Sequence, residues 1–396
     1  MNGQPVVAAM LSKFYAWDFH QKVGLSADQM WRQVQSAGYL GVQGNWFSNP
    51  DGSSPREQFL WDQYRLFFYG PATQDIGRSK DAWAPGLNSS QGRAIIADIV
   101  NFHKRKPYLL FWLVVNEYNP DALPISQYRP VHDYVRSLDP ARLTGDIYVL
   151  AGSTSTREQI YQIGGVMLPE ISVDQSGNAD HPFARLLGEL LLQERVWQQG
   201  IRFIRGVSTT PIGEFIPMGV HPCGDHRPYP YPYVELERWY LTQVALNARA
   251  FEVLWGPSQT EGGCSPSQTA WGSWARVMEV WTWQTTLVRH LTTTLRSVIL
   301  SPSSFSRIVG ATPPFEEPSQ FNGFVYRGIY AAQKQAGATY LAVVNTQSND
   351  LQNVTVPVSG SAAVDLLTGE RFPVSSGQLR WSTFPALKAR ILRVEP

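Results

Sequence analysis

Charged side chains are scarce in this sequence of 396 residues, and neither sign is in surplus. They make up 16% of the chain, below the roughly 25% of an average globular protein. The 33 basic residues nearly balance the 32 acidic ones. Proteins that bind nucleic acid or an anionic membrane surface through basic patches usually carry a basic surplus. We therefore expect neither partner. An apolar content of 43% also excludes a disordered polyelectrolyte.

Long apolar runs and cysteines are scarce as well. No apolar run reaches the roughly 18 residues of a membrane-spanning helix, so we expect no membrane span. Cys223 and Cys264 cannot form a zinc site by themselves, and no pair of histidines has metal-ligand spacing on a helix. We expect no metal and no other cofactor.

Aromatic residues, in contrast, are abundant at 12% of the chain, and 14 of them are Trp. Flat aromatic rings fill protein cores, and they also stack on the faces of sugar rings. The composition therefore suits a protein that binds carbohydrate, although core packing explains much of it equally well.

Apolar runs and amphipathic stretches alternate over about the first 300 residues. Strands are expected at 5–15, 39–44, 64–69, 108–115, 144–150, 164–168, 201–215 and 251–255. Helices are expected at 26–34, 92–102, 131–137, 157–163, 181–199, 234–248 and 268–295. This alternation predicts an α/β fold, a (β/α)8 TIM barrel over residues 1–300. A doubly wound open sheet is the alternative, but no glycine-rich phosphate-binding fingerprint follows the first strand.

The pattern changes after residue 301. Short alternating runs separated by glycine, serine and asparagine turns follow, at 323–330, 340–345, 354–358, 363–366 and 389–394. Such runs are typical of antiparallel strands. We predict a small antiparallel β-sandwich domain over residues 301–396.

Two glutamates stand where predicted barrel strands end. Glu117 follows the apolar run of the fourth strand, and Glu214 follows the seventh. Catalytic groups of TIM barrels lie at the carboxyl ends of the strands. Retaining glycoside hydrolysis requires two carboxyl groups about 5 Å apart, one as nucleophile and one as acid/base. For Glu117, a strand-end glutamate that turns outward to solvent is the simpler alternative.

These segments resemble the clan A glycoside hydrolases. In that clan an apolar fourth strand with a Trp leads into Asn-Glu, and the next helix ends near Leu-Asp-Pro-x-Arg, as at 111–117 and 138–142 here. The segment 210–215 is similar to the seventh-strand segment that holds the clan's nucleophile. Further similar segments are the entry to the first strand at 2–6, the eighth strand at 251–255 and the β-domain strand at 340–345.

The resemblance implies a retaining enzyme that cleaves β-glycosidic bonds of an oligo- or polysaccharide. Glu117 would be the acid/base, Glu214 the nucleophile, and Asn116 would hydrogen-bond the sugar 2-hydroxyl. Many members of the clan place a Tyr on the sixth strand, near the nucleophile. Residues 165–172 contain none, and Glu170 is expected to occupy that region instead.

Further substrate-binding candidates follow three other strands. Trp17, Trp46 and Trp255 are each expected either to floor a sugar subsite or to pack in the core or a loop, and Asp18 and Asn45 stand beside the first two. Three Trp at strand ends favour at least one sugar-binding platform.

Two other functional classes stay open on the sequence. One is a carbohydrate-binding barrel that has lost catalysis, and the other is a barrel enzyme of unrelated chemistry that uses Asp146, Glu170 or Asp174.

Two further expectations concern location and crosslinking. A secreted or periplasmic location is favoured, with the signal segment absent from this chain. The cysteines follow the seventh and eighth strands, so a disulfide between Cys223 and Cys264 would stiffen the rim if the chain is secreted. Two unrelated thiols are the alternative.

Overall fold

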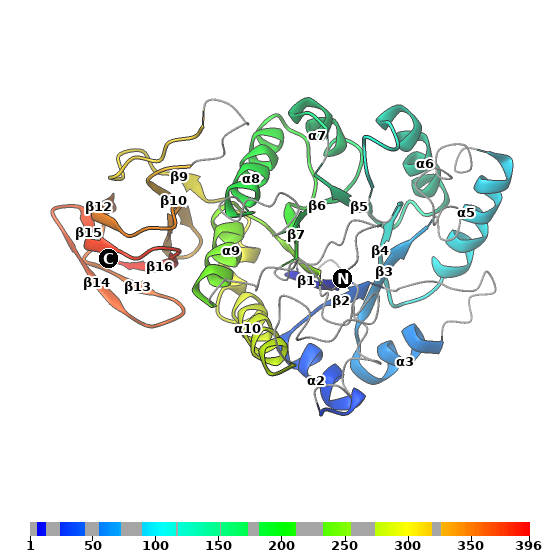
Figure 1. Cartoon of the computed structure of the whole chain (residues 1–396), viewed down its shortest axis with the longest axis horizontal. Helices are drawn as coiled ribbons and strands as arrows, with labels where there is room; N and C mark the ends of the chain where they lie inside the picture. The colour runs from blue at the N-terminus through cyan, green and yellow to red at the C-terminus, as the bar shows by residue number, and fades with distance from the viewer. Residues whose placement is uncertain are drawn as a thin grey trace.

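The computed structural model describes residues 6–12, 24–43, 55–72, 89–115, 118–150, 152–172, 182–210, 233–254, 274–318 and 326–396. Eight parallel strands close into a barrel, and each pairs with its neighbours in chain order (Figure 1). The barrel strands are β1 (Ala8–Ser12), β2 (Gly41–Gln43), β3 (Phe67–Pro71), β4 (Leu109–Leu113), β5 (Thr144–Val149), β6 (Val166–Ser172), β7 (Gly206–Thr210) and β8 (Ala250–Leu254). The predicted TIM barrel is confirmed, and a doubly wound open sheet is excluded.

Helices surround the barrel (Figure 1). They are α2 (Ala27–Ala37), α3 (Pro55–Tyr64), α5 (Ser90–His103), α6 (Ile125–Leu138), α7 (Thr154–Ile160), α8 (Pro182–Gln198), α9 (Tyr233–Ala245), α10 (Trp274–Thr292) and the short α11 (Arg296–Leu300). Helix α3 was not expected from the sequence, and the strand predicted to start at Tyr64 begins only at Phe67. Because Phe59 is exposed while Leu60 and Tyr64 are buried, the apolar residues of α3 form no single stripe.

The first and last barrel helices meet at the start of the barrel. Ser26 and Gln29 form the capping box that the sequence predicts at the start of α2. At its end, Gly38 adopts φ 86°, and a Cβ there would lie 2.4 Å from the hydroxyl of Thr292 on α10. That hydroxyl donates to the carbonyl of Ala37 at 3.1 Å. A glycine at position 38 is therefore needed for both its conformation and this contact.

The remaining strands form an eight-stranded antiparallel sheet in the order β12-β15-β14-β13-β16-β11-β10-β9, which we call the β-domain. They are β9 (Ser306–Arg307), β10 (Ile329–Gln335), β11 (Thr339–Asn345), β12 (Leu351–Pro357), β13 (Ala362–Asp365), β14 (Arg371–Ser375), β15 (Gln378–Phe384) and β16 (Ala389–Glu395). The sheet folds over a core that includes Leu341 and Leu392 on one side and Val354 and Leu379 on the other. The predicted β-sandwich is confirmed, but β9, β14 and β15 were missed, and β10 lies later than the run predicted at 323–330.

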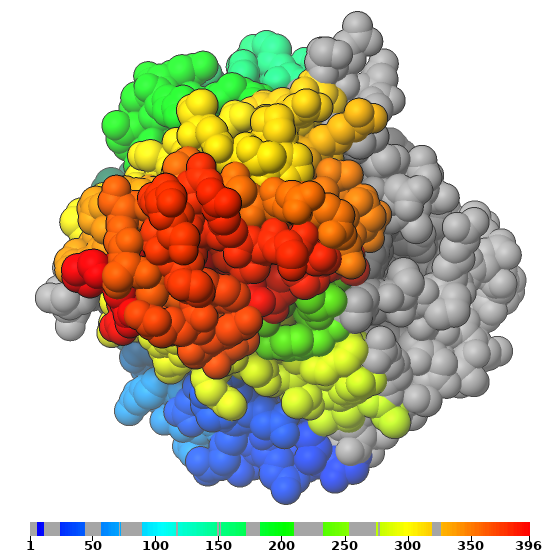
Figure 2. All heavy atoms as spheres, turned by 90° about the vertical axis from the view of Figure 1, so that its left-hand side faces the viewer, coloured from blue at the N-terminus to red at the C-terminus, as the bar shows by residue number. Residues whose placement is uncertain are grey.

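The outer face of the β-domain packs on the barrel helices. Tyr330, Ala342 and Ile391 belong to the same buried apolar cluster as Trp239 of α9. Every residue of α9 from Glu235 to Ala245 is buried. Figure 1 shows α9 between the barrel and the β-domain, and Figure 2 shows the orange and red β-domain covering this side of the molecule. Helix α9 is thus enclosed by both parts of the chain.

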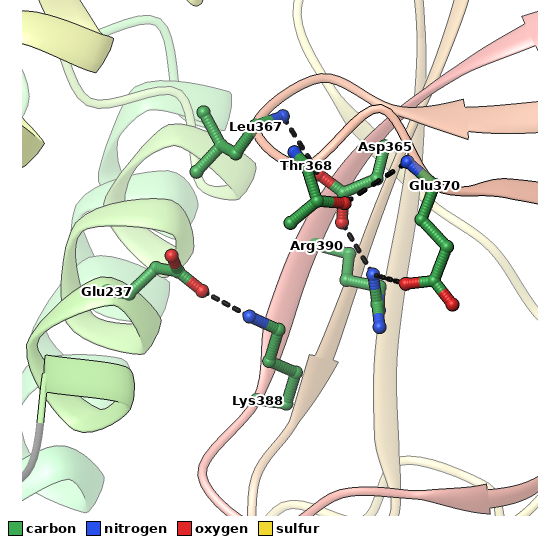
Figure 3. A network of polar contacts seen from close by, with 7 residues as sticks. All are labelled: Glu237, Asp365, Leu367, Thr368, Glu370, Lys388 and Arg390. Carbon is green, nitrogen blue, oxygen red and sulfur yellow. Dashed lines mark hydrogen bonds and ion pairs between the residues drawn. The ribbon is translucent and has the colours of Figure 1, made fainter.

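Polar contacts accompany the apolar ones at this junction. Arg238 of α9 donates to the carbonyls of Asn345 at 3.2 Å and Gln347 at 3.1 Å. Lys388 forms an ion pair with Glu237 of α9 (Figure 3). Because these charges are largely buried, each needs its partner nearby.

A second network holds the β13–β14 turn of the β-domain, and it is also drawn in Figure 3. Arg390 pairs with Asp365 at 2.7 Å and with Glu370 at 2.9 Å. Asp365 also accepts from the amides of Leu367 at 2.9 Å and Thr368 at 3.2 Å. The turn is thereby fixed next to the junction with the barrel, where Leu367 packs on the shared apolar cluster.

The domain boundary that we predict near residue 300 falls between α11, which ends at Leu300, and β9, which begins at Ser306. The division of the chain into two domains, residues 1–300 and 301–396, stays a prediction. Within the described ranges, none of the helices is both long and apolar enough to span a bilayer. Cys223 and Cys264 lie outside the described residues, so their link also stays a prediction.

Candidate active site at the barrel rim

The predicted catalytic pair belongs to segments that follow β4 and β7. Strand β4 ends at Leu113 and β7 ends at Thr210. Asn116, Glu117 and Glu214 lie outside the described residues. So do the other strand-end candidates Trp17, Asp18, Asn45, Trp46 and Trp255, together with Asp174. Their roles stay predictions. Of the candidate site residues named from the sequence, the structure describes Glu170 and Asp146.

Glu170 lies near the carboxyl end of β6 and is buried, with 5% of its surface exposed. Val166 and Leu168 of the same strand belong to the apolar cluster inside the barrel. Because side chains alternate along a strand, Glu170 points to the same interior. Its register partner on β7 is Ser208, which is fully buried. Because Glu214 lies outside the described residues, the expected closeness of Glu170 to the nucleophile stays a prediction.

A second interior glutamate was missed by the sequence reasoning. Glu252 of β8 is 1% exposed and is the register partner of Ser208 on the other side of β7. Glu170, Ser208 and Glu252 therefore form one row over three neighbouring strands. With strands about 4.8 Å apart, the two glutamate backbones are about 10 Å apart. The signal was present in the sequence, since Glu252 interrupts an apolar strand at a position that alternation turns inward.

Tyr69 of β3, three strands away from β8 around the barrel, reaches Glu252 across the interior. Its hydroxyl donates to the Glu252 carboxylate, and its ring stacks on Phe111 of β4 at 4.9 Å. On β6 the interior changes from the apolar Val166 and Leu168 to Glu170, which lies nearer the rim in the same row as Ser208 and Glu252. Buried carboxylates require hydrogen-bond donors, and Tyr69 supplies one of them.

The end of β4 is held from outside the barrel. The amide of Val115 donates to Asp146 Oδ1 at 2.7 Å, and the hydroxyl of Tyr128 on α6 donates to Asp146 Oδ2. Asp146 has no exposed surface, and burial raises the pKa of its carboxyl well above its usual range, which these hydrogen bonds partly oppose. Asp146 is therefore unavailable to a substrate in the barrel, which argues against its use as a catalytic group.

The layer outside β5 also contains a buried histidine. His132 of α6 contacts the Thr144 hydroxyl through Nδ1 at 3.3 Å, and its ring meets that of Tyr128 edge to face. Burial lowers the pKa of His132 to about 3, so the imidazole is neutral at pH 7. Within the part of the chain that the structure describes, no cluster of three or more His, Cys, Asp or Glu could hold a metal ion.

Comparison with known proteins yields matches in structure but not in sequence. No family model and no curated protein matches the chain. A GH27 β-L-arabinopyranosidase from Geobacillus stearothermophilus is 11% identical, with a TM-score of 0.58, covering 100% of this chain and 97% of that chain. A family 5 glycoside hydrolase from Bacteroides vulgatus is 11% identical (TM-score 0.57, 100% and 90% covered), and an Anoxybacillus α-amylase is 10% identical (0.57, 98% and 98%). At such identities the similarity shows the shared fold alone.

Proposed function

We propose that this chain is a retaining glycoside hydrolase that cleaves β-glycosidic bonds of an oligo- or polysaccharide. Glu214 is the nucleophile, and Glu117 is the acid/base. Asn116 binds the sugar 2-hydroxyl. The aromatic residues Trp17, Trp46 and Trp255 supply stacking surfaces for the sugar rings.

One observation carries the proposal. The two strands that precede Glu117 and Glu214, β4 and β7, belong to one closed parallel barrel, so their carboxyl ends share one rim. That rim is where TIM-barrel enzymes hold their catalytic groups. The shared fold with three solved proteins that are named as glycosidases or amylase supports the same class of reaction.

The proposed reaction proceeds by two displacements at the anomeric carbon. Glu214 attacks that carbon, the glycosidic bond breaks, and Glu117 gives its proton to the leaving oxygen. A covalent glycosyl ester on Glu214 results. Glu117, now ionised, then takes a proton from water as the water attacks the same carbon, and Glu214 leaves. Two inversions at one centre retain the β configuration.

The nucleophile is tested with Glu214→Ala on a panel of 4-nitrophenyl β-glycosides. We expect turnover of the cleaved substrate to be lost, and added azide to restore it with an α-glycosyl azide as product, because azide replaces the missing carboxylate. Glu158→Ala, on the outer helix α7, is the matched control and should keep wild-type activity. Wild-type turnover by Glu214→Ala would contradict the assignment.

The acid/base is tested with Glu117→Ala. This variant should lose far more activity on phenyl glycosides than on dinitrophenyl glycosides, since only the former leaving group needs a proton. Azide should rescue it with a β-configured product. An NMR time course in which the wild type first releases the inverted anomer would overturn the retaining mechanism. Oligosaccharide binding without any hydrolysis would favour the carbohydrate-binding alternative.

A further inference from the structure

The chain on both sides of the Asn116–Glu117 dipeptide is anchored to β5. Before it, the amide of Val114 donates to the carbonyl of Gly145 at 2.9 Å. After it, the amide of Tyr118 donates to the carbonyl of Ile147 at 3.0 Å, and Tyr118 forms a parallel bridge with Tyr148. These backbone hydrogen bonds are the usual contacts between neighbouring parallel strands. In addition, side chains on the outer side of the barrel contact the same stretch of chain, and these contacts centre on one carboxylate.

That carboxylate is Asp146. It accepts from the backbone amide of Val115, the residue directly before the dipeptide, at 2.7 Å. Its other oxygen accepts from the hydroxyl of Tyr128. Both Asp146 and Tyr128 have no exposed surface, so water does not compete for these bonds.

Tyr128 also reaches the other side of the dipeptide. Its ring stacks on that of Tyr118, the residue directly after the dipeptide, with centroids 4.0 Å apart and planes inclined by 16°. The Tyr118 hydroxyl donates in turn to the carbonyl of Leu123 at 2.9 Å. Val115, Asp146, Tyr128 and Tyr118 thus form a continuous chain of contacts that joins the two ends of the dipeptide through α6. We call these four residues the bracket.

Another buried tyrosine–carboxylate cluster shows what is particular about the bracket. Glu189 of α8 accepts from the hydroxyls of Tyr148 and Tyr161 and from Arg157. These three partners all bind through their side chains, so that cluster joins helices to the barrel wall. The Asp146 carboxylate instead binds a backbone amide just past the end of a barrel strand, where the position of the chain matters for the rim.

We propose that Asp146 and Tyr128 are positioning residues that fix both ends of the Asn116–Glu117 dipeptide, and so orient the acid/base for proton transfer. The inference rests on the proposed function, in which Glu117 carries the proton. A displacement of about 1 Å in a catalytic group can reduce a rate about a hundredfold. The side chains of Asp146 and Tyr128 do not touch substrate, because both are buried between β5 and α6.

The first test measures the bracket without any substrate. Amide hydrogen exchange over residues 109–123 is compared between wild type, Tyr128→Phe and Asp146→Ala. We expect exchange at Val115 and Tyr118 to accelerate at least tenfold in Asp146→Ala and less in Tyr128→Phe. Asp146→Asn should stay close to wild type, because its Oδ1 still accepts from Val115 and its amide can donate to the Tyr128 oxygen.

Tyr64→Phe is the matched control. It removes the same atom from the same kind of bond, since the Tyr64 hydroxyl donates to Asp28 at 2.8 Å, but at the end of α3, next to the start of β3. We expect no change at Val115 or Tyr118 in this variant. Unchanged exchange at both positions in Asp146→Ala would overturn the bracket.

The second test measures proton transfer through the leaving group. For phenyl and 2,4-dinitrophenyl β-glycosides of the sugar that the wild type cleaves, kcat/KM is compared within each variant. Tyr128→Phe should lower kcat/KM about tenfold on the phenyl glycoside and little on the dinitrophenyl glycoside. The ratio of kcat/KM for the dinitrophenyl glycoside to kcat/KM for the phenyl glycoside therefore rises, and it should rise further in Asp146→Ala. The ratio is internal to each variant, so a smaller folded fraction does not change it.

The outcomes separate this inference from the function on which it rests. A ratio in Tyr128→Phe and Asp146→Ala equal to that of Tyr64→Phe, with Glu117→Ala still showing a wide ratio, overturns the positioning role and leaves the function intact. If the wild type cleaves none of the glycosides, the proposed function and the positioning role both fall. The exchange measurement then still decides whether the bracket holds the end of β4.

Discussion

Two buried tyrosine–carboxylate bonds lie on opposite sides of the barrel wall, and they use their carboxylates differently. Inside the barrel, Tyr69 donates to Glu252, which shares a row with Glu170. Outside it, Tyr128 donates to Asp146, whose other oxygen takes a backbone amide. The inner carboxylate belongs to a polar layer near the rim, whereas the outer one holds the backbone. In this barrel, the role of a buried acid therefore depends on whether its side chain points into the barrel or out toward the helices.

The largest expected effect is on the outer side. Asp146→Ala leaves two buried donors, the Val115 amide and the Tyr128 hydroxyl, without their acceptor. Each stranded donor costs about 2 kcal/mol, so the free energy of unfolding should fall by about 4 kcal/mol. Urea unfolding at pH 7 measures it. A loss below about 1 kcal/mol would mean that the outer carboxylate does not hold the backbone.

A smaller effect comes from His132, which lies beside the outer bond. Its pKa of about 3 is below the ordinary 6.5, so the folded state binds fewer protons than the unfolded state between these values. Stability from this group is present above pH 6.5 and is lost as the pH falls, by about 2 kcal/mol at pH 5. His132→Asn should lack this component when urea unfolding is compared at pH 7 and pH 5.

Asp146 itself should show the opposite sign. Its pKa is raised by burial, so its contribution to stability is complete below about pH 4 and decreases as the pH rises. Relative to Asp146→Asn, wild type should lose stability with rising pH, by at most about 1.4 kcal/mol per pH unit. A difference between the two proteins that is independent of pH from 4 to 7 would contradict the direction given for Asp146.

The smallest effect sharpens the comparison most directly. Tyr69→Phe and Tyr128→Phe each remove one hydroxyl that donates to a buried carboxylate. Each substitution should lower the free energy of unfolding by about 1 kcal/mol. Their stabilities should thus be similar, while hydrogen exchange at the Val115 amide should rise only in Tyr128→Phe. Equal exchange rates at the Val115 amide in both variants would contradict the claim that the outer bond, and not the inner one, holds the backbone at the end of β4.

The barrel could be predicted because its strands carry a local signal. The uninterrupted apolar run around Trp112 predicts β4, and the alternation of runs predicts the closed fold. Strands β14 and β15 were missed because Arg371 and Pro373 interrupt the first and polar residues on the outer face dilute the second, although Leu379 and Trp381 alternate inward.

The candidate site was predictable to a lesser extent, and for a physical reason. A glutamate inside an apolar strand, such as Glu252, is visible in the sequence, because alternation gives its direction. The bracket is not visible, because Asp146 and Tyr128 are 18 residues apart and meet Val115 only after α6 packs on β5. Contacts set by packing between elements have no local pattern.

The enclosure of α9 has a consequence for synthesis of the protein on the ribosome. Residues of β16, the last strand of the chain, join the apolar cluster that covers α9, yet α9 is translated about 150 residues earlier. At a translation rate of about 5–20 residues per second, the apolar surface of α9 stays exposed for roughly 8–30 s before β16 is synthesised. During that interval a nearly complete barrel exposes an apolar helix surface, which is the kind of surface that chaperones bind.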